Sequence, residues 1–303
     1  MADAERQLAV EGAQRLRVAA CSVAAGLFFF GGQLAVTAVG AKEQTIGVLQ
    51  GLAPALQGLR AAATDPRTVH EQFLVHNQVA LIAAFLVSNL GALAMIAPLR
   101  YLAAAERARS AAPSALIGYL ALYGPILLAV FLPAFEISLI IGAHNYLSHS
   151  ARDAAAITAA TGGGLRVAFQ LILTLGTLGV AGAFIMISMR AMRVGLLTRM
   201  MGIVGIIGGV LFLIPLTPLP VVQALWLVFV GAMLLGFGGR PLPEAWTAGE
   251  ARPWPPRQSA RPARPARQPP RGMRRGAASP PVPAPAAPRG PSPSASKKRK
   301  RRR

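Results

Sequence analysis

The chain has 303 residues, of which 53% are hydrophobic and only 14% are charged, and its formal net charge is +20. A soluble domain carries about 25% charged residues, so this composition excludes an ordinary soluble fold and indicates a membrane protein. The charge is uneven, because residues 239–303 hold 17 of the 31 lysines and arginines and only two of the 11 acidic residues.

The first apolar segment, residues 18–40, follows an N-terminal segment, 1–17, that contains three arginines. It is longer than the roughly 20 residues that cross a bilayer. The alternative is a cleaved signal peptide that ends at "AVGA", 38–41, but signal cores have only about 7 to 15 residues. We therefore expect a retained transmembrane helix. The single cysteine, Cys21, lies within it and excludes an intrachain disulfide or a multi-cysteine metal or redox motif.

Five further apolar segments follow along the chain. Residues 79–99, 113–143 and 167–188 are each long enough to span the hydrocarbon core. Residues 200–216 and 221–237 are shorter, and the "TPLP" between them cannot continue a helix, which predicts a tight helical hairpin. The predicted fold is an all-α membrane protein, a bundle of six transmembrane helices.

The positions of lysine and arginine predict the orientation of this bundle. These residues lie before the first segment, between the second and third, between the fourth and fifth, and after the sixth, at 26 of the 31 positions. The two long loops on the other side, residues 41–78 and 144–166, hold the remaining five. This pattern predicts six crossings with both termini in the cytoplasm.

Glu136 and Asn89 are the polar candidates inside the apolar segments. Glu136 follows Pro113 by 23 residues, which is about 35 Å along a helix and places it near the outer edge of the bilayer. It is either a carboxylate that handles protons or cations or an interfacial residue, and its depth favours the second. Asn89 lies at the midpoint of its segment, and like Gln33 and Gln170 it fits hydrogen bonding between helices better than ligand binding.

Glycines recur in the fourth and fifth segments at spacings that let helix backbones approach closely. The candidates for helix packing are Gly176, Gly179, Gly182, Gly202, Gly205 and Gly209. We expect them to pack helices within one bundle, and homo-oligomerisation is the alternative.

All four histidines fall in the two long outer loops, which raises the hypothesis of an external metal or pH-sensing site. Its candidate residues are His70, His76, His144, His149 and Asp153. No HxxxH or HExxH spacing occurs among them, and polar residues belong in loops in any case, so the metal site is the lesser hypothesis. Nucleotide-binding and hydrolase motifs are also absent, and we expect no cofactor and no catalytic residue.

Residues 239–303 hold 16 of the 25 prolines and predict a disordered cytoplasmic tail with polyproline II character. The tail ends in seven consecutive positive charges, Lys297, Lys298, Arg299, Lys300, Arg301, Arg302 and Arg303. Anionic lipid head groups and nucleic acid would both attract such a run. We expect the lipid, because the membrane is always near, and the alternative is a solvated tail that only enforces topology.

The stretch "RAMRVGLLTRMMGIVGIIGGVLFLIPL", followed by "EAWTAGEARPWP", resembles uncharacterised multi-pass membrane proteins of GC-rich bacteria, a family of unknown function. The resemblance implies a location in the bacterial plasma membrane and no particular activity. Three classes of function follow from the sequence: a non-enzymatic scaffold or sensor with an interacting tail, a small-solute transporter or channel that uses Glu136, and a membrane enzyme with an external histidine site. The scarcity of polar residues near the midplane favours the first.

Overall fold

The computed structural model describes residues 2–44, 66–148, 163–237 and 241–254. All regular secondary structure within these ranges is helical, which confirms the all-α prediction. Each of the six predicted apolar segments forms a helix. The basic end of the chain lies outside the described residues.

Four of the described helices are long and apolar enough to cross a membrane. They are α1 (Ala2–Gly40), α4 (Gln78–Arg109), α5 (Ala115–Ser148) and α7 (Gly164–Arg193). Even α7, the shortest, has 30 residues. At 1.5 Å per residue that is about 45 Å, against a hydrocarbon core of about 30 Å. These helices mark the chain as a membrane protein.

The helices continue beyond their apolar segments. Residues 100–109, which follow the predicted apolar segment 79–99, are the last turns of α4, and the N-terminal segment 1–17 is helical from Ala2. Both stretches are rich in alanine and arginine, which favour helix. A helix satisfies its own backbone hydrogen bonds, so it can leave the hydrocarbon core without ending, and the apolar boundary does not predict where it stops.

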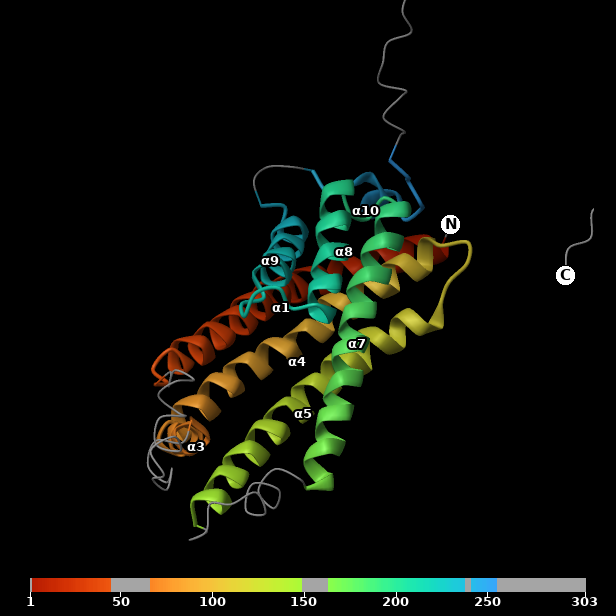
Figure 1. The fold of residues 1–303 in the computed structure, drawn as a ribbon. Helices are drawn as coiled ribbons and strands as arrows, with labels where there is room; N and C mark the ends of the chain where they lie inside the picture. Colours follow the sequence, from red (N-terminus) through yellow and green to blue (C-terminus); the bar gives the residue numbers. More distant parts are fainter. Residues whose placement is uncertain (1, 45–65, 149–162, 238–240, 255–303) are drawn as a thin grey trace, which may run out of the picture. The chain divides into compact units, whose positions relative to one another are not determined.

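The four long helices form a row that two short helices close on one side (Figure 1). Along the row, α1 packs against α4, α4 against α5, and α5 against α7. The short helix α8 (Arg199–Leu213) packs against α7, and α9 (Val221–Leu235) packs against α1 and α8. The six helices therefore form a ring over the length of α8 and α9. Beyond the turn that joins these two, α7 continues without them (Figure 1).

The α8–α9 hairpin is short for a pair of membrane crossings. Each of its helices has 15 residues, about 22 Å of helix against the roughly 30 Å of hydrocarbon core. The α8 helix starts at a cap, where the Thr198 hydroxyl accepts a hydrogen bond from the Met201 N–H at 3.2 Å. Three prolines in the turn 214–220 prevent its extension, Pro215, Pro218 and Pro220.

The hairpin turn reaches the middle of the long helices. It lines a cavity together with Phe29 of α1 and Leu128 of α5, the central residues of the predicted apolar segments 18–40 and 113–143. Aromatic rings hold it at that depth, since Phe212 of α8 lies 5.8 Å from Phe29 between ring centroids. The Phe212 ring also lies 5.3 Å from Phe184 of α7. The predicted hairpin is present, and its turn lies halfway along its neighbours.

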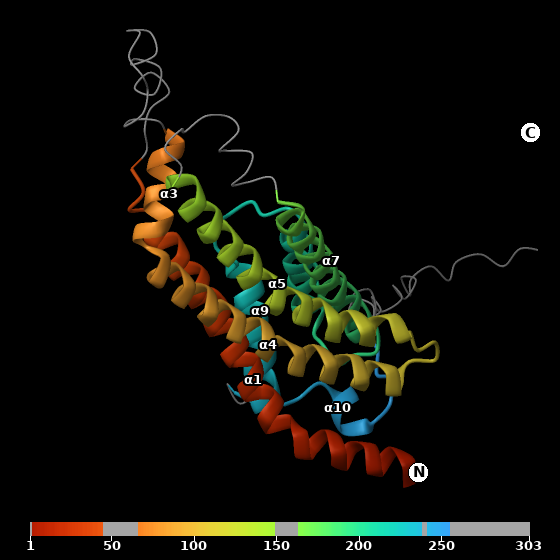
Figure 2. The same ribbon diagram turned by 90° about the horizontal axis from the view of Figure 1, so that it is seen from below.

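Two described helices were not predicted. The first, α3 (Pro66–His76), packs against α5, and the second, α10 (Glu244–Ala248), precedes the C-terminal tail. The predicted start of disorder at residue 239 is wrong, because residues 241–254 are folded. The physical reason is that α10 buries Ala245 and Trp246. Figure 2 shows α10 beside the N-terminal part of α1 and the end of α4.

The predicted packing glycines all lie at helix contacts. Gly176, Gly179 and Gly182 of α7 face α5, where an added Cβ would contact Leu127, Gly124 and Leu120 respectively. The glycines of α8 face α7, and they are Gly202, Gly205 and Gly209. Each contact joins two helices of the same chain. We infer no second copy from them.

The close approach of α1 to α4 depends on two further glycines. A Cβ on Gly91 would overlap the backbone of Phe29, and a Cβ on Gly32 would overlap the backbone of Ser88. Main-chain atoms cannot give way as a flexible side chain does. Only glycine fits at these two positions.

Replacing Gly91 by alanine should force α1 and α4 apart. Overpacking of this kind costs about 1 to 3 kcal/mol, and we expect Gly91→Ala to lower the thermal unfolding temperature of the purified protein. Gly31→Ala is the matched control, because no atom lies within 4 Å of an added Cβ there. Equal unfolding temperatures for the two variants would contradict this account of the α1–α4 contact.

Candidate functional site

A buried ion pair joins the end of α4 to the N-terminal part of α1. Arg109 is the last residue of α4, and its Nη1 and Nη2 donate to the two carboxylate oxygens of Glu11 at 2.8 and 2.7 Å. The Arg109 side chain is fully buried, and its Nε donates to the Ala245 carbonyl at 2.9 Å. A bidentate pair of this kind is among the strongest polar contacts in proteins, and its two parallel hydrogen bonds also fix the relative orientation of the two side chains.

Trp246 of α10 completes the group, which we call the juxtamembrane clamp: Glu11, Tyr101, Arg109 and Trp246. The Arg109 guanidinium lies 5.5 Å from the centre of the Trp246 ring, and the Tyr101 ring stacks on the same indole with centroids 5.4 Å apart. The Tyr101 hydroxyl donates to the Glu11 carbonyl at 3.0 Å. Cation–π and aromatic contacts thus add to the ion pair. The clamp holds α10 against both α1 and α4.

The chain after α10 is fastened to the turn between α7 and α8. The indole N–H of Trp246 donates to the Leu196 carbonyl at 2.9 Å, and that of Trp254 donates to the Leu197 carbonyl at 2.9 Å. The Arg252 N–H donates to the Val194 carbonyl at 3.0 Å. Gly195 makes the approach feasible, because its φ is +82° and a Cβ there would overlap the Arg252 carbonyl. Residues 241–254 are therefore held at several points.

A second ion pair lies beside the clamp. Arg190 of α7 approaches Glu106 of α4 at 3.4 Å and donates to the Ala112 carbonyl at 2.9 Å. The Glu106 side chain is buried, and its second oxygen has no hydrogen-bond partner among the described residues. These contacts bring α4 and α7 together at the end of the ring where the clamp lies.

Polar side chains also meet where α1 crosses α4. Gln33 donates from Nε2 to the Ser88 hydroxyl at 3.1 Å. Asn89, the predicted intramembrane candidate, follows Ser88 in the sequence and is buried. Its Oδ1 has no hydrogen-bond partner among the described residues. Interhelical bonds of the Gln33–Ser88 type fit the role predicted for such side chains. Gln170, in contrast, is exposed on α7 and makes no side-chain contact of this kind with the described residues.

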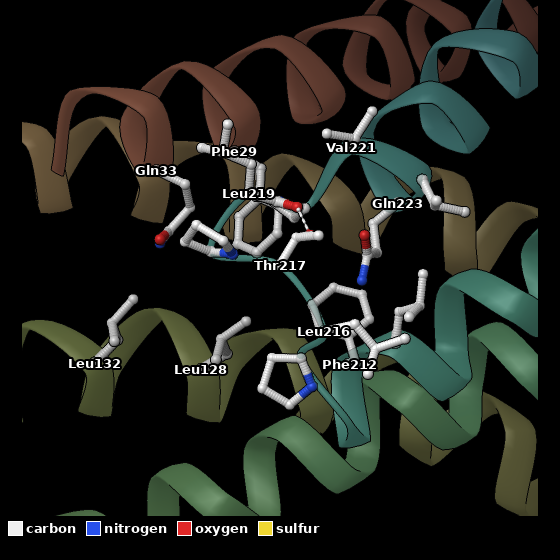
Figure 3. Close-up of a pocket in the computed structure, with 15 residues that line it drawn as sticks. Phe29, Gln33, Leu128, Leu132, Phe212, Leu216, Thr217, Leu219, Val221 and Gln223 are labelled. Carbon is white, nitrogen blue, oxygen red and sulfur yellow. Dashed lines mark hydrogen bonds between the residues drawn. The ribbon is translucent and has the colours of Figure 1, made fainter. Parts of the chain in front are cut away.

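Figure 3 shows the cavity at the hairpin turn. Its volume is about 220 Å³, and its walls come from α1, α5, α8, α9 and the turn. The lining is apolar apart from Gln33, Thr217 and Gln223. Gln223 is 4% exposed, and its amide points toward the cavity (Figure 3). Among the described residues this amide has no hydrogen-bond partner, and its atoms keep accessible surface toward the cavity.

Glu136, the other intramembrane candidate, is half-buried on α5 and forms no ion pair within 4 Å among the described residues. Arg166 of α7 lies close by, with its guanidinium 5.7 Å from the centre of the neighbouring Phe135 ring. The same end of the bundle holds a cavity of about 410 Å³ lined in part by Arg67, Glu71 and Arg166. Glu136 does not line that cavity.

The histidines do not gather into one site. His70 contacts Glu43 at 2.7 Å, and His144 contacts Gln78 at 3.1 Å. No group of three histidine, cysteine or acidic side chains close enough to hold a metal ion exists within the described ranges. The other metal candidates, His149 and Asp153, lie outside these ranges, as do the seven basic residues at the end of the tail.

The sequence did not predict the clamp or Gln223. The charge pattern assigns Arg109 only to the cytoplasmic side, although a basic residue at a helix end also suits a buried carboxylate partner. Glu11 and Trp246 lie 98 and 137 residues from Arg109 along the chain in opposite directions, so no spacing pattern joins them. Gln223 was detectable as the only amide in the apolar run "VVQALWLVF".

Comparison with protein families, curated proteins and solved structures finds no match for this chain. The resemblance proposed for the α7–α10 region stays a prediction.

Removing the Arg109 guanidinium should release the segment 241–254. Arg109→Met keeps much of the side-chain volume but breaks a buried pair, which costs on the order of 3 kcal/mol. We expect amide hydrogen exchange in 241–254 to rise strongly while exchange in the middle of α4 stays slow. Arg107→Met, at an exposed position two residues away, is the control. Unchanged protection of 241–254 in Arg109→Met would show that the clamp does not hold this segment.

Proposed function

We propose that this chain is a multi-pass protein of a bacterial plasma membrane with four crossings, α1, α4, α5 and α7. In this proposal the α8–α9 hairpin enters the membrane from the cytoplasmic side and returns, in place of the two extra crossings expected from the sequence. Helix length supports it, since 15 residues give about 22 Å of helix. The turn between them also lies beside Phe29 and Leu128, in the middle of the long apolar segments.

The distribution of charge supports the orientation. Arg100, Arg107 and Arg109 on α4 and Arg190 and Arg193 on α7 all lie at the end of the bundle that carries the clamp. Basic residues concentrate on the cytoplasmic side of membrane proteins. Four crossings and a half-membrane hairpin leave both termini on that side, as six crossings would.

Labelling with a membrane-impermeant maleimide tests the orientation. In a Cys21→Ala background, we expect Gln44→Cys to react from outside intact cells and Arg193→Cys to react only after the cells are opened. Arg193 is the last residue of α7, and Gln44 follows the end of α1 at Gly40. Reaction of Arg193→Cys from outside would reverse the proposed orientation.

For its molecular role, the geometry best supports a non-enzymatic membrane scaffold that presents a basic tail from a fixed point. The observation that carries this proposal is the clamp. Arg109 and Trp246 of the clamp, together with Trp254, fasten residues 241–254 to the end of α4 and to the turn between α7 and α8. A segment that served only as a loose connection would not need a buried ion pair and two indole hydrogen bonds.

The remaining residues, 255–303, carry 15 lysines and arginines and no acidic residue. An anionic membrane surface attracts each such charge by roughly 1 kcal/mol, within a Debye length of about 8 Å. The clamp would keep the start of this segment at the cytoplasmic face. We therefore propose anionic lipid head groups as the partner of residues 297–303.

Flotation of full-length protein in neutral nanodiscs with added vesicles tests this role. We expect binding to vesicles that contain phosphatidylserine, little binding to neutral vesicles, and loss of binding as salt rises. Replacing all seven residues from Lys297 to Arg303 by glutamine should weaken binding at least tenfold. The variant with arginine at Lys297, Lys298 and Lys300 keeps the charge and should bind normally.

Duplex DNA serves as the competing surface in the same experiment. Binding that ignores salt, equal binding by the glutamine variant, or preferential binding to DNA over anionic vesicles would each contradict the proposed lipid partner.

A further inference from the structure

We propose that the cavity at the turn of the α8–α9 hairpin binds an uncharged, membrane-dissolved molecule whose ring-sized head carries a carbonyl or hydroxyl oxygen. The cavity lies between the hairpin turn and the middle of α1 and α5 (Figure 3). This site is independent of the role proposed for the clamp and the tail, and the clamp lies at the other end of α8 and α9.

The amide of Gln223 supplies the hydrogen-bonding chemistry. It belongs to a residue that is only 4% exposed, and within the described residues it has no hydrogen-bond partner. Its amide atoms keep accessible surface that faces the cavity, so they can pair with a molecule that enters it. A ligand oxygen can accept a hydrogen bond from its N–H, and a ligand hydroxyl can donate to its carbonyl oxygen.

The other polar groups of the cavity are partly satisfied. Gln33 donates one N–H to Ser88, which leaves its carbonyl oxygen and second N–H for a ligand. The Thr217 hydroxyl donates to the Leu219 carbonyl at 2.9 Å and keeps its lone pairs as acceptors. These groups and the Gln223 amide come from three different elements, α1, the turn and α9, and all line the same space.

The absence of charge decides the class of ligand. Every described residue that lines the cavity is apolar or a neutral amide or hydroxyl. A charged ligand would lose its hydration without gaining a counter-ion, which is costly at this depth. The apolar walls include Phe29, Leu132 and Phe212 and suit a ring.

The volume limits the size of the bound head group. An apolar cavity of about 150 Å³ accepts benzene, and this one measures about 220 Å³. A substituted six-membered ring would fill it. Residues 213–218 beside it are exposed, so a hydrocarbon tail could leave the cavity along the turn.

Retention of tritiated decylbenzoquinone by nanodiscs that contain the full-length protein tests the site, with empty nanodiscs as the background. We expect saturable binding that Gln223→Leu weakens about tenfold, the loss of one hydrogen bond of about 1.4 kcal/mol. Gln170→Leu makes the same substitution at an exposed position on α7 and should bind as the unchanged protein does.

Competitors identify the chemistry of the ligand. If decanol displaces the quinone and decane does not, the site accepts both hydroxyl and carbonyl oxygens. If neither displaces it, the site is specific for a ligand with a carbonyl oxygen. Equal displacement by decane, equal binding by Gln223→Leu, or no saturable binding would overturn the proposal. If Gln223→Leu does not fold, Leu132→Trp fills the cavity from α5 without removing a hydrogen bond, and retained binding there would also overturn it.

Discussion

The structure depends on one constraint, the thickness of a hydrocarbon core that offers no hydrogen-bond partner. A helix satisfies its own backbone and can cross it, but a turn cannot be exposed to lipid without cost. Four helices of this chain exceed the required length, and α8 and α9 do not. Their turn, rich in proline, removes three N–H donors that would otherwise need partners. The remaining polar groups of the turn lie beside the cavity that contains Gln223.

The position of the hairpin follows from packing rather than from hydropathy. Phe212 contacts both Phe29 and Phe184, and the Trp226 indole donates to the Met201 carbonyl at 3.0 Å. Ser22 of α1 donates to the Leu227 carbonyl at 2.7 Å, which fixes α9 against α1. These contacts join four helices and leave the hairpin little freedom to slide. The clamp does the same for the segment after α9, at the opposite end.

The sequence was sufficient to predict the apolar helices of the fold. It was not sufficient to predict how deep each helix lies in the membrane or which helices it packs against. Long apolar runs and the "TPLP" break predicted the helices and the hairpin, because both depend on local composition. Hydropathy could not show that α4 runs on to Arg109, since polar helix continues outside the bilayer. It also could not show that Gly91 meets Phe29 or that Arg109 meets Glu11. Those pairs form only through the order in which the helices pack.

The candidate site was predicted less well for the same reason. Asn89 and Gln33 were predicted as intramembrane amides, but the cavity joins Gln33 of α1 to Gln223 of α9, and Asn89 does not line it. Glu136, the charged candidate, lies outside that cavity. A charge in an apolar helix is conspicuous in a sequence, whereas several neutral amides occur in the apolar segments, and only the packing of the helices shows that Gln33 and Gln223 line one cavity.

The central claim is that the hairpin turn lies at the middle of the bilayer. A nitroxide label at Thr217→Cys, in a Cys21→Ala background and reconstituted in lipid, measures this depth through its accessibility to oxygen and to a water-soluble nickel complex. Val79→Cys, at the start of an apolar segment, gives the boundary reference. We predict high accessibility to oxygen and low accessibility to the nickel complex at residue 217. This result would place residue 217 deeper in the bilayer than residue 79. Equal depth for the two labels would contradict the half-membrane hairpin and would support six crossings, with α8 and α9 each spanning the membrane.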